Sequence, residues 1–532
     1  MEFLDTIHNY LLSVMTLVPL VGAGVIWFFD EKTQGALIKR VSMAFSLVVL
    51  ALALWMWVGF NDELSGELRF VERYSWVPTL NIFYHVGVDG LSVTMVVLTA
   101  IVTPLALAAS WGVTERVRLY FSLFLLLQTG MVGVFTALNF FHWFIYWEIG
   151  LVPMFFLIRL WGSANRKYAS FKFFIYTLAG SLAMLLTFLA LFWATGTFDI
   201  MELGRLSSSG ELSGRLMEFV SKINTRTGFS FTVAGVMTLM FWGAFLGFAI
   251  KVPIWPFHTW LPDAHTEAPT AGSMVLAAVL LKMGVYGFLR FILPIFPAQC
   301  VENLDILLFV ALASIIFGAF AAMAQNDAKR MIAYSSVNHM GYCMLGIFSV
   351  VASNQGLATA ELEKASALHG AVLQMFNHGI SSAALFFLIG VVYERAHTRQ
   401  LDAFGGLRAI MPIYSGVWGI AMFSSLGLPG LNGFVSEFLV FKGSWPLVTM
   451  WAGLALIGVV ATAVFLLVMT QKMFFGPLKE QWKSLPDMTT REIIIVAPLL
   501  VFMLLVGVFP QPLIQAADLS VHELIRAVQK WT

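Results

Sequence analysis

Long apolar stretches recur along most of the chain and predict helices that cross a lipid bilayer. A spanning helix needs about 20 mostly apolar residues, and fourteen stretches of roughly that length can be marked in the sequence. They cover residues 11–29, 41–60, 91–111, 119–138, 140–160, 173–193, 231–254, 274–293, 304–324, 331–352, 368–393, 410–441, 450–474 and 493–509. The pattern predicts an all-α, polytopic membrane protein.

Two further segments have the pattern of helices that lie along a membrane surface. Residues 211–223 and 521–528 carry apolar side chains at helical spacing, and the first segment has charged side chains opposite them. The N-terminus carries the acidic residues Glu2 and Asp5, whereas a signal peptide begins with positive charge. We therefore expect the first apolar stretch to be a retained membrane helix.

Basic residues are unevenly distributed over the loops and predict an orientation. One set of alternate loops holds 18 Lys and Arg and the other set holds 11. Cytoplasmic loops carry the excess of positive charge. With an even number of spans, both chain ends are then expected on the external side.

Composition narrows the function classes. The chain is 59% hydrophobic and 11% charged, with a net charge of +1, so lipid is an expected partner and nucleic acid is not. The two cysteines, Cys300 and Cys343, fall short of the about four that an iron–sulfur cluster needs. We expect no cofactor and no metal in this chain.

Few ionisable residues lie deep in the apolar runs or beside a helix break, and four are singled out: Glu148, Lys251, Lys282 and Glu437. A charge at the bilayer centre costs at least about 2.5–3.5 kcal/mol, so each is a functional hypothesis. The competing interpretations are structural. Glu148 could be a protonated acid bonded to a neighbouring helix, Lys251 could snorkel from a helix end, and Lys282 could belong to a salt bridge.

Two of these residues adjoin predicted helix breaks. Pro253 follows Lys251, and the glycine-rich segment 427–433, which contains Pro429, precedes Glu437. Its G-x-x-G-x-x-G spacing is no dinucleotide fingerprint, because no strand precedes it. Backbone groups freed at membrane depth are tolerated where they are buried in protein or line a cavity.

The breaks fall in the seventh and twelfth apolar stretches and therefore predict an internal repeat. The two breaks are five helices apart, so they define two units of five helices each, helices four to eight and nine to thirteen. Because each unit has an odd number of helices, the second unit crosses the membrane in the opposite orientation to the first. Paired interrupted helices in corresponding positions indicate a transport site. The expected regions are 1–115, 116–295 for the first unit, 303–476 for the second, and 477–532.

Histidines could connect the buried charges. His339 and His378 lie in apolar surroundings, and a side chain that titrates near pH 6.5 can relay protons. The alternative is a simple hydrogen-bonded core histidine. His369 lies near a helix start, and the spacing of His258 and His265 matches no zinc pattern, so we expect those two in a structured loop.

The first break carries a long motif that resembles a known family. Lys251-Val252-Pro253, residues 256–265 and Glu267-Ala268-Pro269-Thr270 are similar to the signature of the proton-translocating antiporter-like subunits. These comprise three large membrane subunits of bacterial NADH:quinone oxidoreductase (respiratory complex I) and related subunits of multisubunit cation/proton antiporters. The resemblance implies a fourteen-helix fold with two inverted five-helix repeats.

The resemblance also implies roles for single residues. It assigns the proton pathway to Glu148 on helix five, Lys251 on helix seven, Lys282 on helix eight, His339 and His378 on the central axis, and Glu437 at the second break. A glutamate at that last position resembles one of the three large complex I subunits, since other members generally carry lysine. The hypothesis is that Glu148 pairs with Lys251, and that their separation sends a proton to Lys282. From there a hydrated path through His339 and His378 would lead to Glu437 on the exit side.

The resemblance implies a larger assembly. Its other subunits would hold NADH, FMN, iron–sulfur clusters and quinone, and the expected neighbours are the antiporter-like subunits L and N in a bacterial cytoplasmic (inner) membrane. As a translocase subunit without a redox centre, the chain would receive its driving energy from them. A cation/proton antiporter, a membrane-bound hydrogenase-type complex and a structural scaffold are the alternatives.

Overall fold

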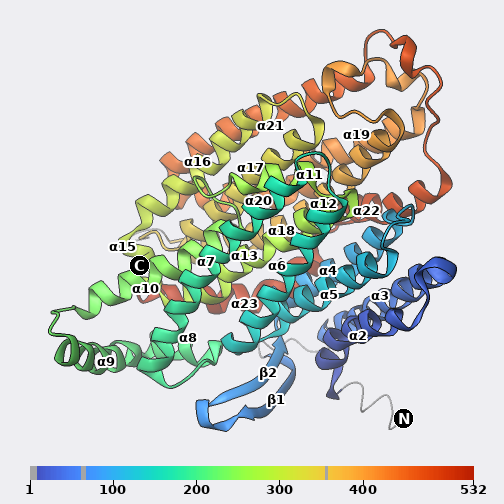
Figure 1. Ribbon diagram of the computed structural model, residues 1–532. Coiled ribbons are helices and arrows are strands. Elements are labelled where there is room, and N and C mark those ends of the chain that lie inside the picture. The colour runs from blue at the N-terminus through green and yellow to red at the C-terminus, as the bar shows by residue number, and fades with distance from the viewer. Residues whose placement is uncertain (1–8, 62–67, 354–357, 532) are drawn as a thin grey trace.

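The computed structural model describes residues 9–61, 68–353 and 358–531. The acidic residues Glu2 and Asp5 therefore lie outside the described part. Twelve helices in it are long and apolar enough to cross a membrane, and they pack side by side in one bundle (Figure 1). The all-helical, multi-pass membrane architecture predicted from the apolar stretches is confirmed.

The twelve candidate spans follow the predicted stretches in order. They are α2 with η1 (Leu11–Val25 and Ile26–Phe28), α3 (Glu31–Asn61), α4 (Gly90–Ala109), α5 (Val117–Thr136), α6 (Phe140–Trp161), α7 (Arg166–Thr195), α10 (Val233–Lys251), the segment Thr270–Ile295, α16 (Leu304–Met323), α18 (Ala360–Ala396), α21 (Thr449–Phe474) and α22 (Thr490–Val508). The other two stretches hold α17 (Ala328–Ser349) and the pair α19 (Pro412–Leu426) and α20 (Asn432–Leu447). The total of fourteen spans, the inverted repeats and the region boundaries stay predictions.

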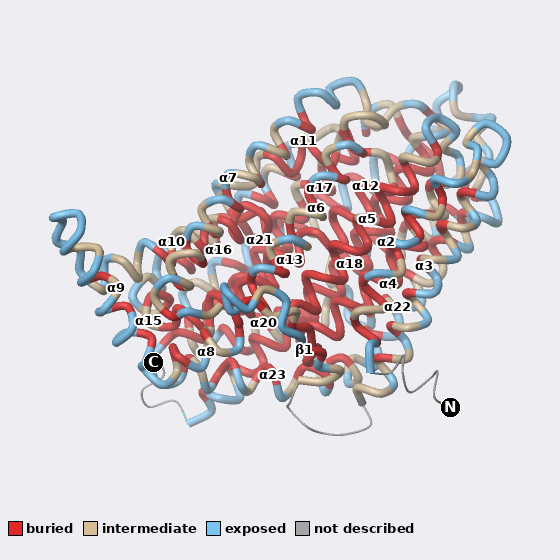
Figure 2. Tube along the Cα trace, turned by 60° about the horizontal axis from the view of Figure 1, so that its bottom comes forward, coloured by how far each residue is buried: buried red, intermediate tan, exposed pale blue. Residues whose placement is uncertain are grey.

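The centre of the bundle is formed by α18 and by the segment Thr270–Ile295. Both are wholly buried in their most apolar windows, and Figure 2 shows α18 and α13 surrounded by other buried elements. The second segment is not one regular helix. It runs through α12 (Thr270–Val275), η3 (Leu276–Leu280), α13 (Leu281–Gly287), η4 (Phe288–Ile292) and α14 (Leu293–Ile295), and η3 and η4 are π-helical.

A two-stranded hairpin departs from the all-α expectation. Strands β1 (Arg69–Val77) and β2 (Ile82–Val88) pair antiparallel around η2 (Pro78–Leu80). The Glu72 carboxylate on β1 accepts hydrogen bonds from the backbone N–H groups of Leu12 and Ser13, each at 3.0 Å. The hairpin thus satisfies donors at the start of α2 that have no partner within that helix.

The two predicted amphipathic segments fold as the helices α9 (Glu211–Thr227) and α23 (Gln511–Gln529), on the same end of the bundle as the hairpin, here called the hairpin face. The helices α8 (Ile200–Ser209) and α15 (Pro297–Glu302), which the sequence did not predict, lie at the same end. Gly90, which begins α4 just after β2, donates to the Ser520 hydroxyl on α23 at 3.1 Å. The apolar side chains of residues 521–528 are buried, so this stripe of α23 faces the bundle.

Short elements cover the opposite end. They are α11 (Trp260–Glu267), η5 (Leu401–Ala403), η6 (Leu407–Ala409) and η7 (Glu480–Trp482). A buried ion pair between Arg395 and Glu492, at 2.7 Å, joins α18 to α22 at this end. Both ends of the described chain lie on the hairpin face, as an even number of spans requires.

Candidate functional site

The first predicted break is present. Helix α10 ends at Lys251, and regular α-helix resumes with α11 at Trp260. The Trp260 indole N–H donates to the carbonyl of Ile250 at 2.8 Å, and the Trp255 backbone N–H donates to the Ser314 hydroxyl at 2.9 Å. Side chains from this segment and from α16 therefore satisfy backbone groups that the break releases. The expected loop around His258 and His265 includes this short helix α11.

Lys251 is buried against an aromatic ring. Its side chain is nearly inaccessible, and its Nζ lies 4.8 Å from the centre of the Trp147 ring on α6. The Trp147 indole N–H in turn donates to the Ser181 hydroxyl on α7 at 3.0 Å. A cation over a tryptophan face is stabilised electrostatically, so Trp147 holds the ammonium at the end of α10.

Glu148 follows Trp147 and interacts electrostatically with Lys251. In the described part of the chain Oε1 of Glu148 has no hydrogen-bond partner and the two residues form no ion pair within 4.0 Å, so the hypothesised pairing is not made in this structure. Glu148 is also less enclosed than its sequence surroundings suggest. It lines an apolar lateral groove of about 850 Å³ between α5 and α6, which also contains Arg116.

Lys282 lies at the centre of the bundle with no exposed surface. Its Nζ is 2.6 Å from the carbonyl oxygen of Ala277 and 2.6 Å from Nδ1 of His378. Ala277 belongs to the π-helical turn η3, and π turns leave carbonyl groups irregularly bonded, often at functional sites. The turn thus supplies an acceptor to a lysine that forms no ion pair with a carboxylate of the described residues.

The helical segment that carries Lys282 packs closely against the end of α10, where Lys251 lies. A Cβ added to Gly284 would lie 3.1 Å from Cβ of Lys251 and 2.8 Å from the backbone nitrogen of Val252. Any larger residue at position 284 would push α13 away from the end of α10. Gly284 therefore lets the segment that carries Lys282 pack directly on the first break.

From Lys282 a series of neighbouring ionisable side chains leads to the second break. The rings of His378 and His339 have centroids 5.3 Å apart, and His339 Nδ1 lies 3.0 Å from a Glu437 carboxylate oxygen. The order is therefore Lys282, His378, His339 and Glu437. The sequence named these four residues but did not order the histidines.

The second predicted break is also present, and a buried amide network surrounds it. Helix α19 ends at Leu426 and α20 begins at Asn432, with Gly427 at φ +84°. The Asn377 side-chain amide donates to the Asn432 carbonyl at 2.7 Å. The Gln374 amide donates to the Glu437 carboxylate at 3.2 Å, which joins the network to the line of ionisable groups.

Gln374 and Asn377 were not predicted as site residues. They precede His378 by four and one positions on α18 and interrupt an otherwise apolar run. Their spacing places them near one face of a helix. A search for polar side chains at helical spacing would have found Gln374 four residues before His378, and then Asn377 three residues after Gln374.

His265 is a further buried histidine that the sequence interpretation assigned to a loop. Its ring stacks on Phe386 at 4.5 Å, and neither ring nitrogen has a hydrogen-bond partner among the described residues. It interacts electrostatically with both Lys282 and Lys329. His369, by contrast, faces Asp518 of α23 at 3.3 Å and lies outside the line.

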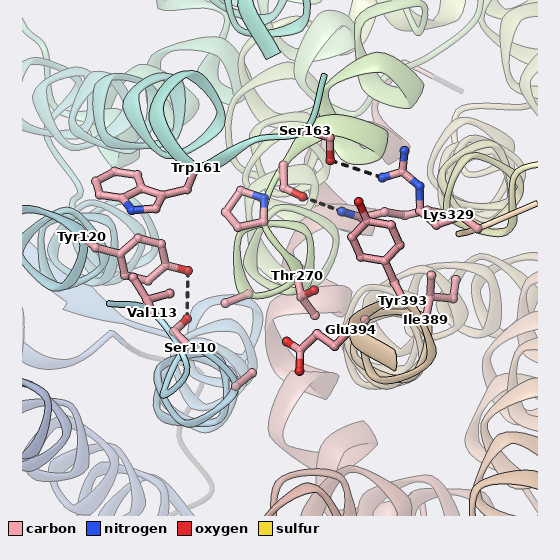
Figure 3. Close-up of a pocket in the computed structure, with 16 residues that line it drawn as sticks. Ser110, Val113, Tyr120, Trp161, Ser163, Thr270, Lys329, Ile389, Tyr393 and Glu394 are labelled. Atoms are coloured by element: carbon pink, nitrogen blue, oxygen red, sulfur yellow. Dashed lines mark hydrogen bonds between the residues drawn. The ribbon is translucent and has the colours of Figure 1, made fainter. Parts of the chain in front are cut away.

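Lys329 leads to a polar cavity away from the hairpin face (Figure 3). The cavity has a volume of about 210 Å³, and its lining includes Tyr120, Lys329, Tyr393 and Glu394. Lys329 donates to the Ala268 carbonyl, and the Tyr120 and Ser110 hydroxyls are 2.9 Å apart. Polar groups therefore extend from this side toward His265 and the centre of the bundle.

Comparison with known proteins gives a consistent result. A family described as NADH:quinone oxidoreductase/Mrp antiporter, TM, matches residues 137–465. NADH-quinone oxidoreductase subunit M of Rhodobacter capsulatus is 41% identical over 97% of this chain and 96% of its own length. The protein of the same name from Pseudomonas aeruginosa is 37% identical over 98% of both chains.

Solved structures show the same fold. A chain of respiratory complex I from Thermus thermophilus superposes with a TM-score of 0.81 at 25% identity, covering 98% of this chain and 99% of that one. A chain of the Mrp complex from Dietzia sp. DQ12-45-1b gives a TM-score of 0.81 at 20% identity over 98% and 99%. By sequence and by structure, the chain belongs to the NADH:quinone oxidoreductase/Mrp antiporter family of membrane proteins.

Proposed function

We propose that the chain is the M-type proton-translocating membrane subunit of a bacterial NADH:quinone oxidoreductase. The single observation that carries the proposal is the series of contacts from Lys282 to His378, from the His378 ring to the His339 ring, and from His339 to Glu437. These side chains come from four different elements, and all four residues are buried. Buried ionisable groups in a membrane mark ion pathways.

The proposed transfer uses the acid–base chemistry of these groups. Burial disfavours the charged form of a lysine, and a nearby carboxylate favours it. Movement of Glu148 relative to Lys251 would therefore change how tightly Lys251 holds its proton. A proton displaced from Lys282 passes from Nζ to Nδ1 of His378, and a histidine can accept at one ring nitrogen and release from the other.

Glu437 is proposed as the residue that releases the proton on the hairpin face. Its carboxylate accepts from His339 and Gln374, so it can receive a proton from the histidine side. It follows the second break, where the helix gap and the amide network supply polar groups for water. Release there places uptake on the opposite face, where Lys329 and Glu394 line the polar cavity.

The energy is proposed to come from partner subunits. Moving one charge against 100 mV costs about 2.3 kcal/mol, and the proposed source is quinone reduction by NADH through FMN and iron–sulfur clusters elsewhere in the complex. Antiporter-like subunits L and N are the proposed neighbours, in the bacterial inner membrane. The relatives that cover almost the whole chain are named as subunits of such an oxidoreductase.

The test is proton pumping by the purified complex in liposomes. Lys282→Ala and Glu437→Gln should abolish proton uptake driven by NADH while subunit composition stays normal. Lys222→Ala is the matched control, because Lys222 is exposed on α9 and pairs only locally with Glu218. Full pumping by both assembled variants would refute the proposal.

The alternative is a subunit of a multisubunit cation/proton antiporter or of a membrane-bound hydrogenase-type complex. The shared fold with the Mrp chain favours the first of these, but at 20% identity it bears on the fold alone. The subunits that co-purify with the native chain distinguish the three assemblies. Flavin and iron–sulfur proteins that oxidise NADH are expected.

A further inference from the structure

A buried ion pair at the hairpin face belongs to the same helical segment as Lys282 but not to the proton line. Arg290 on η4 lies 2.6 Å from a carboxylate oxygen of Asp89, and both side chains are less than one-tenth exposed. Asp89 is the N-cap of α4 and accepts from the backbone N–H groups of Leu91 and Ser92. The loop that follows the hairpin therefore fixes the position of the Arg290 guanidinium.

In the sequence Arg290 lies near the end of the apolar stretch 274–293. The structure encloses it at the end of the segment Thr270–Ile295, where its Nε donates to the Tyr286 hydroxyl at 3.0 Å. Tyr286 also reaches the Phe135 carbonyl of α5 at 3.4 Å. Lys282, Tyr286 and Arg290 follow one another at intervals of four residues, so Tyr286 is the polar group between the two cations.

Beyond Arg290, toward the hairpin face, the structure contains a cavity of about 180 Å³. Its lining includes Asp89, Arg205, Arg290, Ser520 and Glu523. A water molecule occupies about 30 Å³ in the liquid, and polar cavities hold water. Water can therefore approach Arg290 from outside, with Tyr286 and Lys282 on its inner side.

This arrangement poses a problem for directed transport. A proton on Lys282 has the tyrosine and the cavity as a short route to the hairpin face, in addition to the longer route through His378, His339 and Glu437. A proton that took the short route would bypass the second unit, and external protons could return along it. A fixed cation in a narrow path opposes the passage of protons and other cations.

We propose that the Asp89–Arg290 pair is an electrostatic seal that separates Lys282 from the cavity on the hairpin face. The seal makes His378 the acceptor for the Lys282 proton and prevents return of protons through the first unit. Asp89 positions the guanidinium, and Arg290 supplies the charge. The inference rests on the proposed function, since it concerns the direction in which Lys282 gives up its proton.

The first experiment measures passive proton flux into liposomes that contain the whole complex without NADH. Arg290→Gln should raise this flux on the order of tenfold, because a charge a few ångströms from the path no longer opposes the proton. Arg290→Lys keeps the positive charge, so its passive proton flux should remain as low as that of the wild type. Adding Lys282→Ala to Arg290→Gln should remove the leak, because the route passes through Lys282.

A neutral residue beside a buried Asp89 can prevent assembly, so a second variant removes both charges. Replacement of a buried ion pair by neutral groups of similar size is often tolerated, and Asp89→Asn with Arg290→Gln should again be leaky. If either Arg290→Gln or the double variant assembles and shows the same passive proton flux as the wild type, the proposed seal is refuted. NADH-driven pumping by the single variant Lys282→Ala tests the proposed function separately. The proposed function and the proposed seal can therefore fail independently.

A third measurement leaves the pair intact. Ser208→Cys lines the cavity, while the natural cysteines Cys300 and Cys343 are buried. A membrane-impermeant cationic thiol reagent added at the hairpin face should modify Ser208→Cys and spare Lys282→Cys. Modification of Lys282→Cys in the presence of Arg290 would show that no seal exists there.

Discussion

Nζ of Lys282 lies 2.6 Å from Nδ1 of His378, although the two residues are 96 positions apart in the chain. The contact joins the two wholly buried helical segments at the centre of the bundle. It also joins the two units that the sequence predicts, since position 282 falls in the first and position 378 in the second. Proton transfer between the units is therefore expected at this contact.

His378→Leu should stop proton transfer between the units. Leucine fills a similar space and has no nitrogen to accept from Lys282, so the line ends at the lysine. We expect NADH-driven acidification of the liposome interior to fall to the level of a Lys282→Ala complex. His369→Leu is the control, because His369 faces Asp518 rather than the line.

Trp147 should matter through its ring rather than through its hydrogen bond. Trp147→Leu removes a cation–π contact with Lys251 that is worth about 0.5–2 kcal/mol, whereas Trp147→Phe keeps an aromatic face and loses the bond to Ser181. We expect pumping rates to decrease in the order wild type, Phe, Leu. Equal rates for Phe and Leu would show that the ring does not hold the ammonium.

Gln374→Leu should weaken the second break. The change deprives Glu437 of a donor and Ser436 of an acceptor, and each buried group left without a partner costs about 1–3 kcal/mol. A lower thermal transition of the complex and slower pumping are expected together. Gln374→Glu keeps an acceptor for Ser436 but places a second carboxyl group beside Glu437, so repulsion between the two carboxylates should slow pumping as well.

The Arg395–Glu492 pair on the face opposite the hairpin should contribute to stability without carrying protons. Arg395 makes two hydrogen bonds to the Glu492 carboxylate, at 2.8 and 2.7 Å. Arg395→Ala leaves that buried carboxylate uncompensated, a change that costs about 3–5 kcal/mol. Thermal unfolding of the complex should show the loss, and Arg395→Met with Glu492→Leu should recover most of it.

Local chemistry in the sequence determined where the helices run and where they break. Proline and glycine act on their own backbone, so Pro253 and the segment 427–433 placed both interruptions correctly. A charge inside an apolar stretch is costly in any fold, so the sequence alone was enough to single out Lys251, Lys282 and Glu437. Long apolar runs likewise predicted the membrane-embedded helices.

The tertiary structure decided which of these groups touch. Helix rotation and packing depend on the whole bundle, so only the fold places His378 before His339, puts Glu148 in a groove, and adds a hairpin where an all-α chain was expected. Asp89 precedes the apolar stretch 91–111 and Arg290 lies near the end of the stretch 274–293, and their ion pair forms because these distant segments meet at the hairpin face. The sequence by itself determined the ionisable groups, whereas proximity in three dimensions determined their order.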